Sequence, residues 1–293
     1  MESPSGIVTL LTDFGVRDAY VGAMKGVLCA LGRDLRIVDI SHEVPPGDIV
    51  EGAYLLEAAY GWFPAGTVHL VVIDPGVGTT RRAIAARSRG HFFVGPDNGV
   101  LTAALSDAAR TAPSAADGKL PAAPALVHEI REAKYLLPQR SETFHGRDLF
   151  APAAAHIASG VPLQRLGPAI DDPIVLELPA PRILPGRVEG EIIRIDRFGN
   201  AISNITRAML DDLGHGPFDV EVEQRAVGEL RRMYHDVASG EWLALIGSGG
   251  QLEVAARDAN AAVRYGIARG MRVTAAARSM RKANGGAVRR DGT

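Results

Sequence analysis

One stretch of the chain decides its class of fold: Val68-His-Leu-Val-Val-Ile-Asp-Pro-Gly-Val-Gly-Thr-Thr-Arg-Arg82. Residues 71–73 form a continuous apolar run, which is typical of a strand buried on both faces of an α/β sheet. The run ends at Asp74, and Pro75 and Gly76 then predict a turn. Because α/β sheets bind ligands beyond the carboxyl ends of their strands, Asp74 stands where a reactive group is expected. An aspartate that only caps its own turn is the open alternative.

The first half of the chain alternates strand patterns with helix patterns. Strands are predicted over residues 7–12, 36–40, 67–73 and 91–94. Helices are predicted over residues 20–31, 49–62, 99 to about 109, and about 147–159. This alternation predicts an α/β domain with a mixed, mostly parallel sheet flanked by helices.

The second half has a different texture. Prolines between residues 173 and 185 mark the expected domain boundary, and short strands with Gly-rich turns follow, which favours a small all-β barrel or sandwich. Those strands are predicted over residues 190–195, 219–223, 242–246, 252–255 and 272–275. The predicted organisation is an α/β N-terminal domain over residues 1–175, a linker over 176–185, a β-barrel C-terminal domain over 186–280 and a disordered tail over 281–293.

The composition argues against several classes of protein. The 293 residues carry a formal net charge of −2 and no basic stripe, so neither nucleic acid nor an anionic membrane is an expected partner. The chain has no uninterrupted apolar segment long enough for a membrane span and no charged leader, so we expect a soluble cytoplasmic protein. The single cysteine, Cys29, excludes intrachain disulfides, and its helical pattern predicts a small buried side chain.

Three polar clusters in the first half stand at strand ends or helix starts. Asp13 and Asp18 precede the first predicted helix, whose dipole favours carboxylates, so Asp18 can equally be a plain helix-terminal acid. Arg81 lies just past the turn that begins with Asp74. His145 precedes a glycine and a predicted helix, and it is a candidate proton carrier near neutral pH. A histidine that caps the helix is the alternative.

The fourth cluster, Asp196-Arg-Phe-Gly-Asn-Ala-Ile-Ser-Asn204, follows the first predicted strand of the second domain. Phe198 can stack on a flat ring, and the Asn200 amide offers the donor and acceptor pair that binds adenine. A β turn with a stapling aromatic is the alternative. Ser248-Gly-Gly250 is a small-residue turn whose N–H groups can hold a carboxylate. The sequence has no metal-ligand motif, no phosphate-binding glycine loop and no nucleophile elbow.

The chain resembles the S-adenosyl-L-methionine hydroxide adenosyltransferases, hydrolase relatives of the fluorinases and chlorinases. Five motifs carry the resemblance, in the order TDFG-x-x-D-x-Y-V-G-x-M-K-G, D-P-G-V-G-T-x-R, P-D-N-G, T-F-H-G-R-D and D-x-F-G-N-x-x-x-N-I. It covers the chain from about Ile7 to Ala277. The resemblance implies an N-terminal α/β domain, a C-terminal β barrel, and a homotrimer with its nucleoside sites between subunits. S-adenosyl-L-methionine is then the substrate, and no cofactor or metal is expected.

The resemblance also implies roles for residues of these motifs. Asp13 matches a carboxylate that accepts the ribose hydroxyls, and Phe198 and Asn200 match the residues that stack on adenine and read its edge. Asp196 and Ser248 match partners of the methionine ammonium and carboxylate groups. The remaining residues expected to bind substrate are Asp18, Tyr20 and Phe144.

Asp74, Arg81 and His145 match the set of residues thought to position and activate the attacking water. The halogenases differ at this site, since they carry Tyr in place of Asp74 and Ser in place of Gly146. They also have an insertion before the P-D-N-G motif that this chain lacks, and an arginine in place of Gly249. The last difference leaves open how the methionine carboxylate is held.

A carboxylate beside a halide pocket would repel the halide, so Asp74 favours water as the nucleophile. The predicted function is hydrolysis of S-adenosyl-L-methionine by attack of activated water at C5′ of the ribose, which gives adenosine and L-methionine. The alternatives are a regulatory protein that binds S-adenosylmethionine or adenosine with negligible turnover, and a halogenase. A methyltransferase is disfavoured because no glycine-rich loop follows the first strand.

Overall fold

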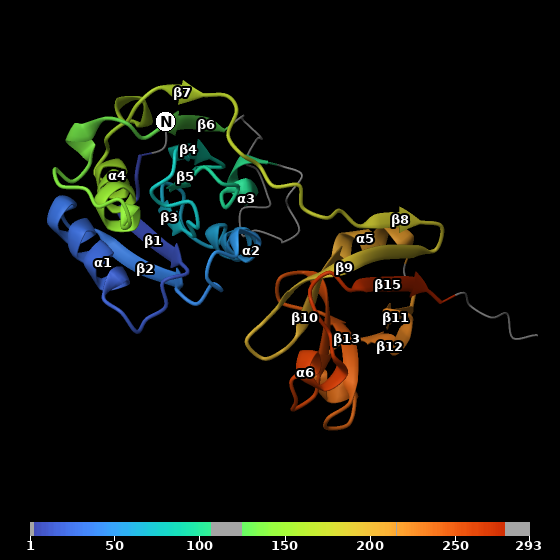
Figure 1. Ribbon diagram of the computed structural model, residues 1–293. Coiled ribbons are helices and arrows are strands. Elements are labelled where there is room, and N and C mark those ends of the chain that lie inside the picture. Colours follow the sequence, from blue (N-terminus) through green and yellow to red (C-terminus); the bar gives the residue numbers. More distant parts are fainter. Residues whose placement is uncertain (1–2, 107–124, 215, 279–293) are drawn as a thin grey trace, which may run out of the picture. The chain divides into compact units, whose positions relative to one another are not determined.

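The computed structural model describes residues 3–106, 125–214 and 216–278 (Figure 1). The chain divides into two compact units, Met1–Leu178 and Pro179–Thr293. The division falls inside the segment 176–185 that the sequence predicts as a linker. Part of that segment, β8 (Arg182–Leu184), is antiparallel to β9 (Arg187–Ile195) and belongs to the sheet of the second unit. The predicted tail over 281–293 lies outside the described residues.

The first unit is built on one mixed sheet. Its strands are β1 (Ile7–Thr12), β2 (Arg36–Ser41), β3 (Val68–Val72), β4 (Ala83–Ser88), β5 (His91–Pro96), β6 (Leu126–Glu129) and β7 (Ala169–Ile170). Their order in the sheet is β2-β1-β3-β5-β4-β6-β7. The first four strands in that order run parallel, whereas β4 is antiparallel to both β5 and β6. The predicted mixed α/β sheet is therefore confirmed.

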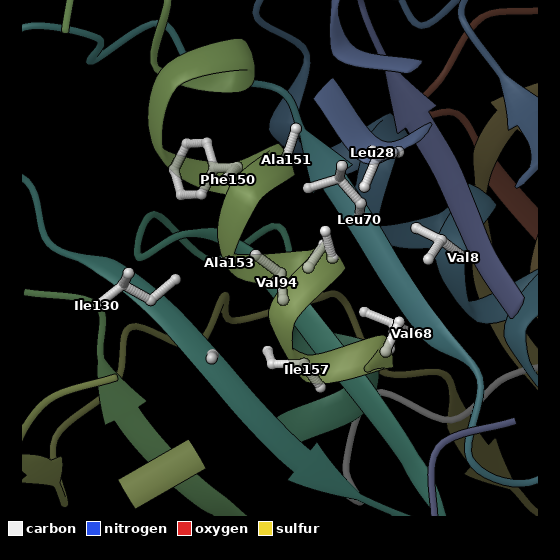
Figure 2. Close-up of a cluster of buried hydrophobic side chains, with 14 of the residues drawn as sticks. Val8, Leu28, Val68, Leu70, Val94, Ile130, Phe150, Ala151, Ala153 and Ile157 are labelled. Carbon is white, nitrogen blue, oxygen red and sulfur yellow. The ribbon is translucent and has the colours of Figure 1, made fainter. Parts of the chain in front are cut away.

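Helices cover both faces of this sheet. They are α1 (Tyr20–Leu31), α2 (Ile49–Tyr60), α3 (Thr102–Leu105), the π-helix η3 (Gly146–Phe150), α4 (Ala151–Ala158) and the short 3₁₀ helices η2 (Ala133–Tyr135) and η4 (Leu163–Arg165). α1 and α4 bury Leu28 and Ile157 on one face of the sheet, against residues such as Leu70 (Figure 2). α2 and α3 pack on the other face, where Val71 joins the second core cluster. Successive residues of β3 thus point to opposite cores, as the pleat of a strand requires.

The second unit is a closed β barrel. Besides β8 and β9, its strands are β10 (Ala201–Thr206), β11 (Phe218–Val222), β12 (Arg225–Arg231), β13 (Trp242–Ile246), β14 (Gln251–Ala256) and β15 (Arg272–Ala277). The sheet order is β10-β14-β13-β12-β11-β15-β9-β8, and pairing of β10 with β9 closes a ring of seven strands. Its helices are α5 (Arg207–Leu213), the 3₁₀ helix η5 (Tyr234–Asp236) and α6 (Ala261–Tyr265). The predicted all-β barrel is confirmed.

Several local predictions differ from the structure. The sequence did not indicate β4, half of whose residues are alanines with low strand propensity; its pairing with β5 and β6 imposes the extended form. α3 is a single turn, shorter than the helix predicted from Gly99, and residues 107–109 of that prediction lie outside the described range. The predicted burial of Cys29 was wrong: the thiol is exposed, on the outer face of α1. Among the described helices, none is long and apolar enough to cross a membrane.

Candidate active site

Asp13 and Asp74 lie at the same end of the sheet, where the carboxyl ends of β1 and β3 meet. β1 and β3 are parallel neighbours in which Thr12 pairs with Val72, so the residues that follow each strand emerge side by side. Asp13 Oδ2 accepts a hydrogen bond of 2.8 Å from the backbone N–H of Gly47. Burial raises the pKa of Asp13, and the charge of Asp74 adds to this rise while the Gly47 N–H opposes it. The two carboxylates therefore share one electrostatic environment.

Arg81 binds both Asp74 and His145. Its Nε donates to the two carboxylate oxygens of Asp74 at 2.9 and 3.1 Å, and its Nη2 donates to Oδ2 as well. Nη2 also lies 2.8 Å from Nδ1 of His145. The side chains of Asp74 and Arg81 are only 5% and 11% exposed, so solvent screens this ion pair little. All hydrogen bonds of the Asp74 carboxylate within the described residues come from Arg81, which excludes the turn-capping alternative.

The contact with Arg81 determines the tautomer of His145. A guanidinium group only donates hydrogen bonds, so Nδ1 of His145 must accept and the ring proton resides on Nε2. Burial, followed by the positive charge of Arg81, lowers the pKa of His145 below its ordinary value of 6.5. The imidazole is thus neutral at neutral pH, with an N–H available on its other side. His145 stands at the N-cap of η3, but its side chain makes no capping hydrogen bond.

A pocket open to solvent lies beside this cluster, and Asp74 and His145 both line it. Its wall includes three aromatic rings in mutual contact, with centroid separations of 5.9 Å for Phe14–Tyr20, 6.0 Å for Phe14–Phe144 and 5.1 Å for Tyr20–Phe144. The remaining lining residues are Val72, Val77, Thr143 and Gly146. The pocket therefore joins an apolar aromatic wall to a carboxylate and an imidazole.

Two of the expected residues of this unit, Asp13 and Asp18, do not line the pocket, and Asp18 is exposed. Tyr20 lines the pocket although 51% of it is exposed. Sequence reasoning missed Asp148, whose fully buried carboxylate accepts from the Ser141 N–H at 2.8 Å and from Arg147 Nε at 2.6 Å. These bonds fix the loop that carries His145. The T-F-H-G-R-D motif contained a partial signal, since Arg147 and Asp148 are adjacent opposite charges that can pair.

In the second unit, Asp196 organises the loop between β9 and β10. Its Oδ1 accepts from the N–H groups of Phe198 at 2.9 Å and Asn200 at 2.8 Å, and its Oδ2 accepts from the Asn200 side-chain amide at 3.0 Å. Gly199 has a φ of +86°, and a Cβ there would lie 2.1 Å from Asn260, so the turn requires glycine. Within the part of the chain that the structure describes, the Asn200 amide oxygen and its second amide hydrogen make no hydrogen bond, so they are available to other partners.

Phe198 is 75% exposed, so it does not staple the turn. Ser248 is exposed in a separate turn between β13 and β14. Sequence reasoning missed Glu253, which is buried beside that turn and accepts a hydrogen bond of 2.6 Å from the Tyr234 hydroxyl. Burial raises the pKa of Glu253; the Tyr234 bond opposes this rise and the charge of Asp196 adds to it. This part of the barrel therefore combines an exposed ring with partly buried carboxylates.

Among residues 3–106, 125–214 and 216–278, no three His, Cys, Asp or Glu side chains gather in a way that could hold a metal ion. The polar groups at and beside the pocket include the carboxylate of Asp74, the imidazole of His145 and the guanidinium of Arg81. Such a set can orient a water molecule and take up a proton from it.

Comparison with known proteins covers both units. The sequence model of the SAM hydroxide adenosyltransferase N-terminal domain matches residues 8–167, and that of the C-terminal domain matches residues 190–274. A protein from Salinispora tropica named (R)-S-adenosyl-L-methionine hydrolase is 40% identical over 93% of this chain and 99% of its own length. A protein of the same name from Thermus thermophilus is 42% identical over 91% and 98%. A fluorinase from Actinoplanes sp. is 27% identical over 92% and 96%.

Two solved structures resemble this chain over most of its length. A crystal structure of an uncharacterized conserved protein from Thermotoga maritima has a TM-score of 0.80 and 33% identity, covering 92% of this chain and 99% of that one. A crystal structure of a conserved hypothetical protein from Thermus thermophilus has a TM-score of 0.71 and 37% identity, covering 93% and 99%. The resemblance noted from the sequence motifs is confirmed.

Proposed function

The chain belongs to the SAM hydroxide adenosyltransferase family, and on that premise we propose that it hydrolyses S-adenosyl-L-methionine to adenosine and L-methionine by attack of water at C5′ of the ribose. Its relatives at 37–42% identity are named as hydrolases, and the chain is an enzyme of that class. The observation that carries the proposed reaction is the Asp74 carboxylate, which Arg81 holds at the pocket that His145 also lines. A carboxylate at this position disfavours a halide nucleophile.

In the proposed step, a lone pair of the water oxygen attacks C5′ in line with the C5′–S bond. The O–C5′ bond forms and the C5′–S bond breaks, and sulfur keeps the bonding pair and leaves as the neutral thioether of methionine. The leaving group needs no proton, so the water is the partner that requires help. Asp74 accepts the proton of the attacking water and returns it to solvent, a form of base catalysis that contributes about 10²–10⁴-fold.

His145 orients the water in this proposal rather than deprotonating it. Its Nδ1 is occupied by Arg81, so its Nε2–H is the group that donates a hydrogen bond to the water oxygen. Arg81 sets the spacing of both neighbours, and such positioning lowers the barrier further because the reacting atoms are held close to the attack geometry. The aromatic wall with Tyr20 and Phe144 keeps bulk water away from the reacting carbon.

The substrate groups are assigned by the family motifs. Asp13 accepts the ribose hydroxyls, and Asp18 follows it in the same motif as a further substrate-binding residue. On the barrel, Phe198 stacks on adenine and Asn200 reads its edge with the free half of its amide. The exposure of Phe198 and the free Asn200 oxygen support this assignment. Asp196 and Ser248 bind the ammonium and carboxylate groups of the methionine part.

We further propose that the protein is a homotrimer in which each site combines the α/β unit of one subunit with the barrel of its neighbour. The support is the family resemblance and the distribution of the expected residues over two separate units. Light scattering should give a mass three times that of one chain. A monomer with full turnover would refute this assembly.

The reaction is tested by incubating the enzyme with S-adenosyl-L-methionine in ¹⁸O-labelled water. Mass spectrometry should find adenosine that carries the label at its 5′-hydroxyl, together with unlabelled L-methionine. Unlabelled adenosine would refute attack of water at C5′. Calorimetric binding without any product would instead favour a regulatory protein that holds the nucleoside, and chloride- or fluoride-dependent loss of substrate would favour a halogenase.

A further inference from the structure

The residues that follow β5 reach both ends of the turn that carries Asp74 and Arg81. β5 is parallel to β3 on one side and antiparallel to β4 on the other. The carboxyl end of β5 therefore lies beside the end of β3, where the turn 74–82 begins, and beside the start of β4, where it finishes. The P-D-N-G motif, Pro96-Asp-Asn-Gly99, occupies this place, and nothing in the proposed reaction uses it.

Asn98 holds the start of the turn. Its side-chain Nδ2 donates a hydrogen bond of 2.9 Å to the backbone carbonyl of Ile73, the residue directly before Asp74. Its Oδ1 accepts from the N–H of Val100 at 3.1 Å, so the amide is held at both ends. Ile73 is itself fully buried, which leaves its peptide little freedom to shift while the bond is intact.

Asp97 holds the end of the turn. The side chain of Asp97 is 1% exposed. Its Oδ2 accepts a hydrogen bond of 2.7 Å from Nε of Arg82, the residue that follows Arg81 in the chain. The Asp97 N–H also donates to the Arg82 carbonyl at 3.0 Å. Oδ1 accepts from the Ile174 N–H at 2.8 Å, which fixes the carboxylate from a third direction. Removal of one partner from a buried, paired charge strongly destabilises a protein, so the geometry of this carboxylate is tightly constrained.

The turn is closed within itself by hydrogen bonds of 3.2 Å from the Val77 N–H to the Asp74 carbonyl and from the Thr79 N–H to the Gly76 carbonyl, but these bonds do not tie it to the sheet. It contains Gly76 and Gly78, and the latter has a φ of +78° that needs glycine. We propose that Asp97 and Asn98 are positioning residues that clamp the two ends of the turn 74–82, and so set the spacing of the Asp74–Arg81 pair relative to His145. This inference rests on the proposed function for its catalytic consequence, whereas its geometric part stands on the hydrogen bonds alone.

The first test is Asn98→Asp in the full-length enzyme. The new carboxylate keeps the acceptor for the Val100 N–H but removes the donor and places a charge against the Ile73 carbonyl. We expect kcat to fall about 10–100-fold while KM for S-adenosyl-L-methionine stays within about twofold, because small displacements of reacting groups have effects of this size. Asn98→Ser, whose hydroxyl still accepts from Val100 but cannot span to Ile73, replaces it if Asn98→Asp does not fold. A kcat within twofold of wild type would overturn the inference.

Asp97→Asn and Asp172→Asn form a matched pair. Both remove a carboxylate partner of Arg82, but Asp172 is 73% exposed and lies outside the clamp. We expect Asp97→Asn to lower kcat about tenfold or more and Asp172→Asn to leave it unchanged. Asp97 would be only a structural residue if the two variants lowered kcat equally. The same conclusion would follow if Asp97→Asn changed both kcat and KM in proportion to a fall in its melting temperature.

A readout independent of turnover separates this inference from the proposed function. NMR titration of the His145 ring should show its pKa rise in Asn98→Ser and Asp97→Asn, because burial still lowers it but a displaced Arg81 no longer adds to the lowering, and stay unchanged in Asp172→Asn. If the wild type releases no adenosine but these shifts occur, the reaction is wrong and the clamp is right. If the wild type is active and His145 does not respond, the clamp is wrong.

Discussion

The two units carry their polar clusters in opposite ways. In the α/β unit, Asp74, Arg81 and His145 are joined by hydrogen bonds, and Asp74 and Arg81 are almost entirely buried. In the barrel, the loop from Asp196 uses its carboxylate to hold its own backbone and leaves Phe198 three-quarters exposed. The first cluster is rigid before any substrate arrives, while the second presents an open aromatic surface.

This difference separates two tasks. A group that acts on a reacting water has to be aligned in advance, because alignment during the reaction adds to the barrier. A group that binds a flat ring gains its free energy from the surface it covers, so it has to be exposed in the free protein. Substitutions in the α/β cluster should therefore act on kcat, and substitutions in the barrel loop should act on KM.

Asp74→Asn should have the largest effect. The amide has almost the same size and keeps an oxygen for Arg81, but it cannot accept a proton from water. We expect kcat to fall about 10²–10⁴-fold, with KM changed less than about threefold. Adenosine formation followed by chromatography measures both. Glu142→Gln is the matched control, because Glu142 is exposed and its charge also acts on His145; it should change kcat less than about threefold. Comparable losses in the two variants would show that the Asp74 carboxylate has no special role in the reaction.

Phe198→Ala should have an intermediate effect, confined to binding. Loss of a stacking ring costs about 1–3 kcal/mol per base, which corresponds to a rise in KM of about 5- to 150-fold. Isothermal calorimetry with adenosine gives the same quantity without turnover. Ile183→Ala, on β8 of the same unit, removes a side chain that is 55% exposed and should leave KM unchanged. A fall in kcat at constant affinity in Phe198→Ala would mean that the barrel loop also aligns the reaction.

Strand ends were the part of the site that could be predicted from the sequence. An apolar run that stops at Asp13 or Asp74 indicates a buried strand followed by a polar group at the sheet edge, and parallel neighbours bring such groups together. The sequence could not show that Arg81 bridges Asp74 to His145, because a contact over 64 residues depends on where η3 packs. The proton position on His145 follows only from that contact.

The fold shows the same limit. The apolar pattern of β3 has one interpretation, but the alanines of β4 have low strand propensity and adopt the extended form only between β5 and β6. β10 was not predicted, because the segment up to Asn204 is rich in polar residues and was interpreted as a polar cluster with a turn. Ser203 and Asn204 are nevertheless fully buried, and their side chains form hydrogen bonds with the backbone of β14 and β9. Tertiary pairing, absent from any local pattern, decides such segments.

The smallest expected effect concerns stability in acid, and it again separates the units. His69 and His91 are buried in the α/β core, 3.3 Å apart through Nε2 and Nδ1. Burial and the neighbouring histidine lower the pKa of His69 well below 6.5, and burial lowers the pKa of His91 to about 4. Below pH 6.5 the unfolded chain takes up protons that the folded unit refuses, so stability is constant above this pH and falls beneath it. Each of these histidines lowers the free energy of unfolding by about 1.4 kcal/mol for every pH unit below 6.5, until the pH reaches its pKa in the folded state.

The described part of the barrel has no buried histidine, and burial raises the pKa of its Glu253 carboxyl, so acid should not destabilise the barrel over the same range. The chain has one tryptophan in each unit, Trp62 and Trp242, so urea unfolding of Trp62→Phe and Trp242→Phe variants reports on the units separately. Between pH 7.5 and 5.5 the midpoint seen through Trp62 should fall while that seen through Trp242 should not. His91→Gln should reduce the fall, because it removes one of the buried groups that resist protonation. Equal acid sensitivity of both midpoints would mean that buried histidines do not set the difference between the units.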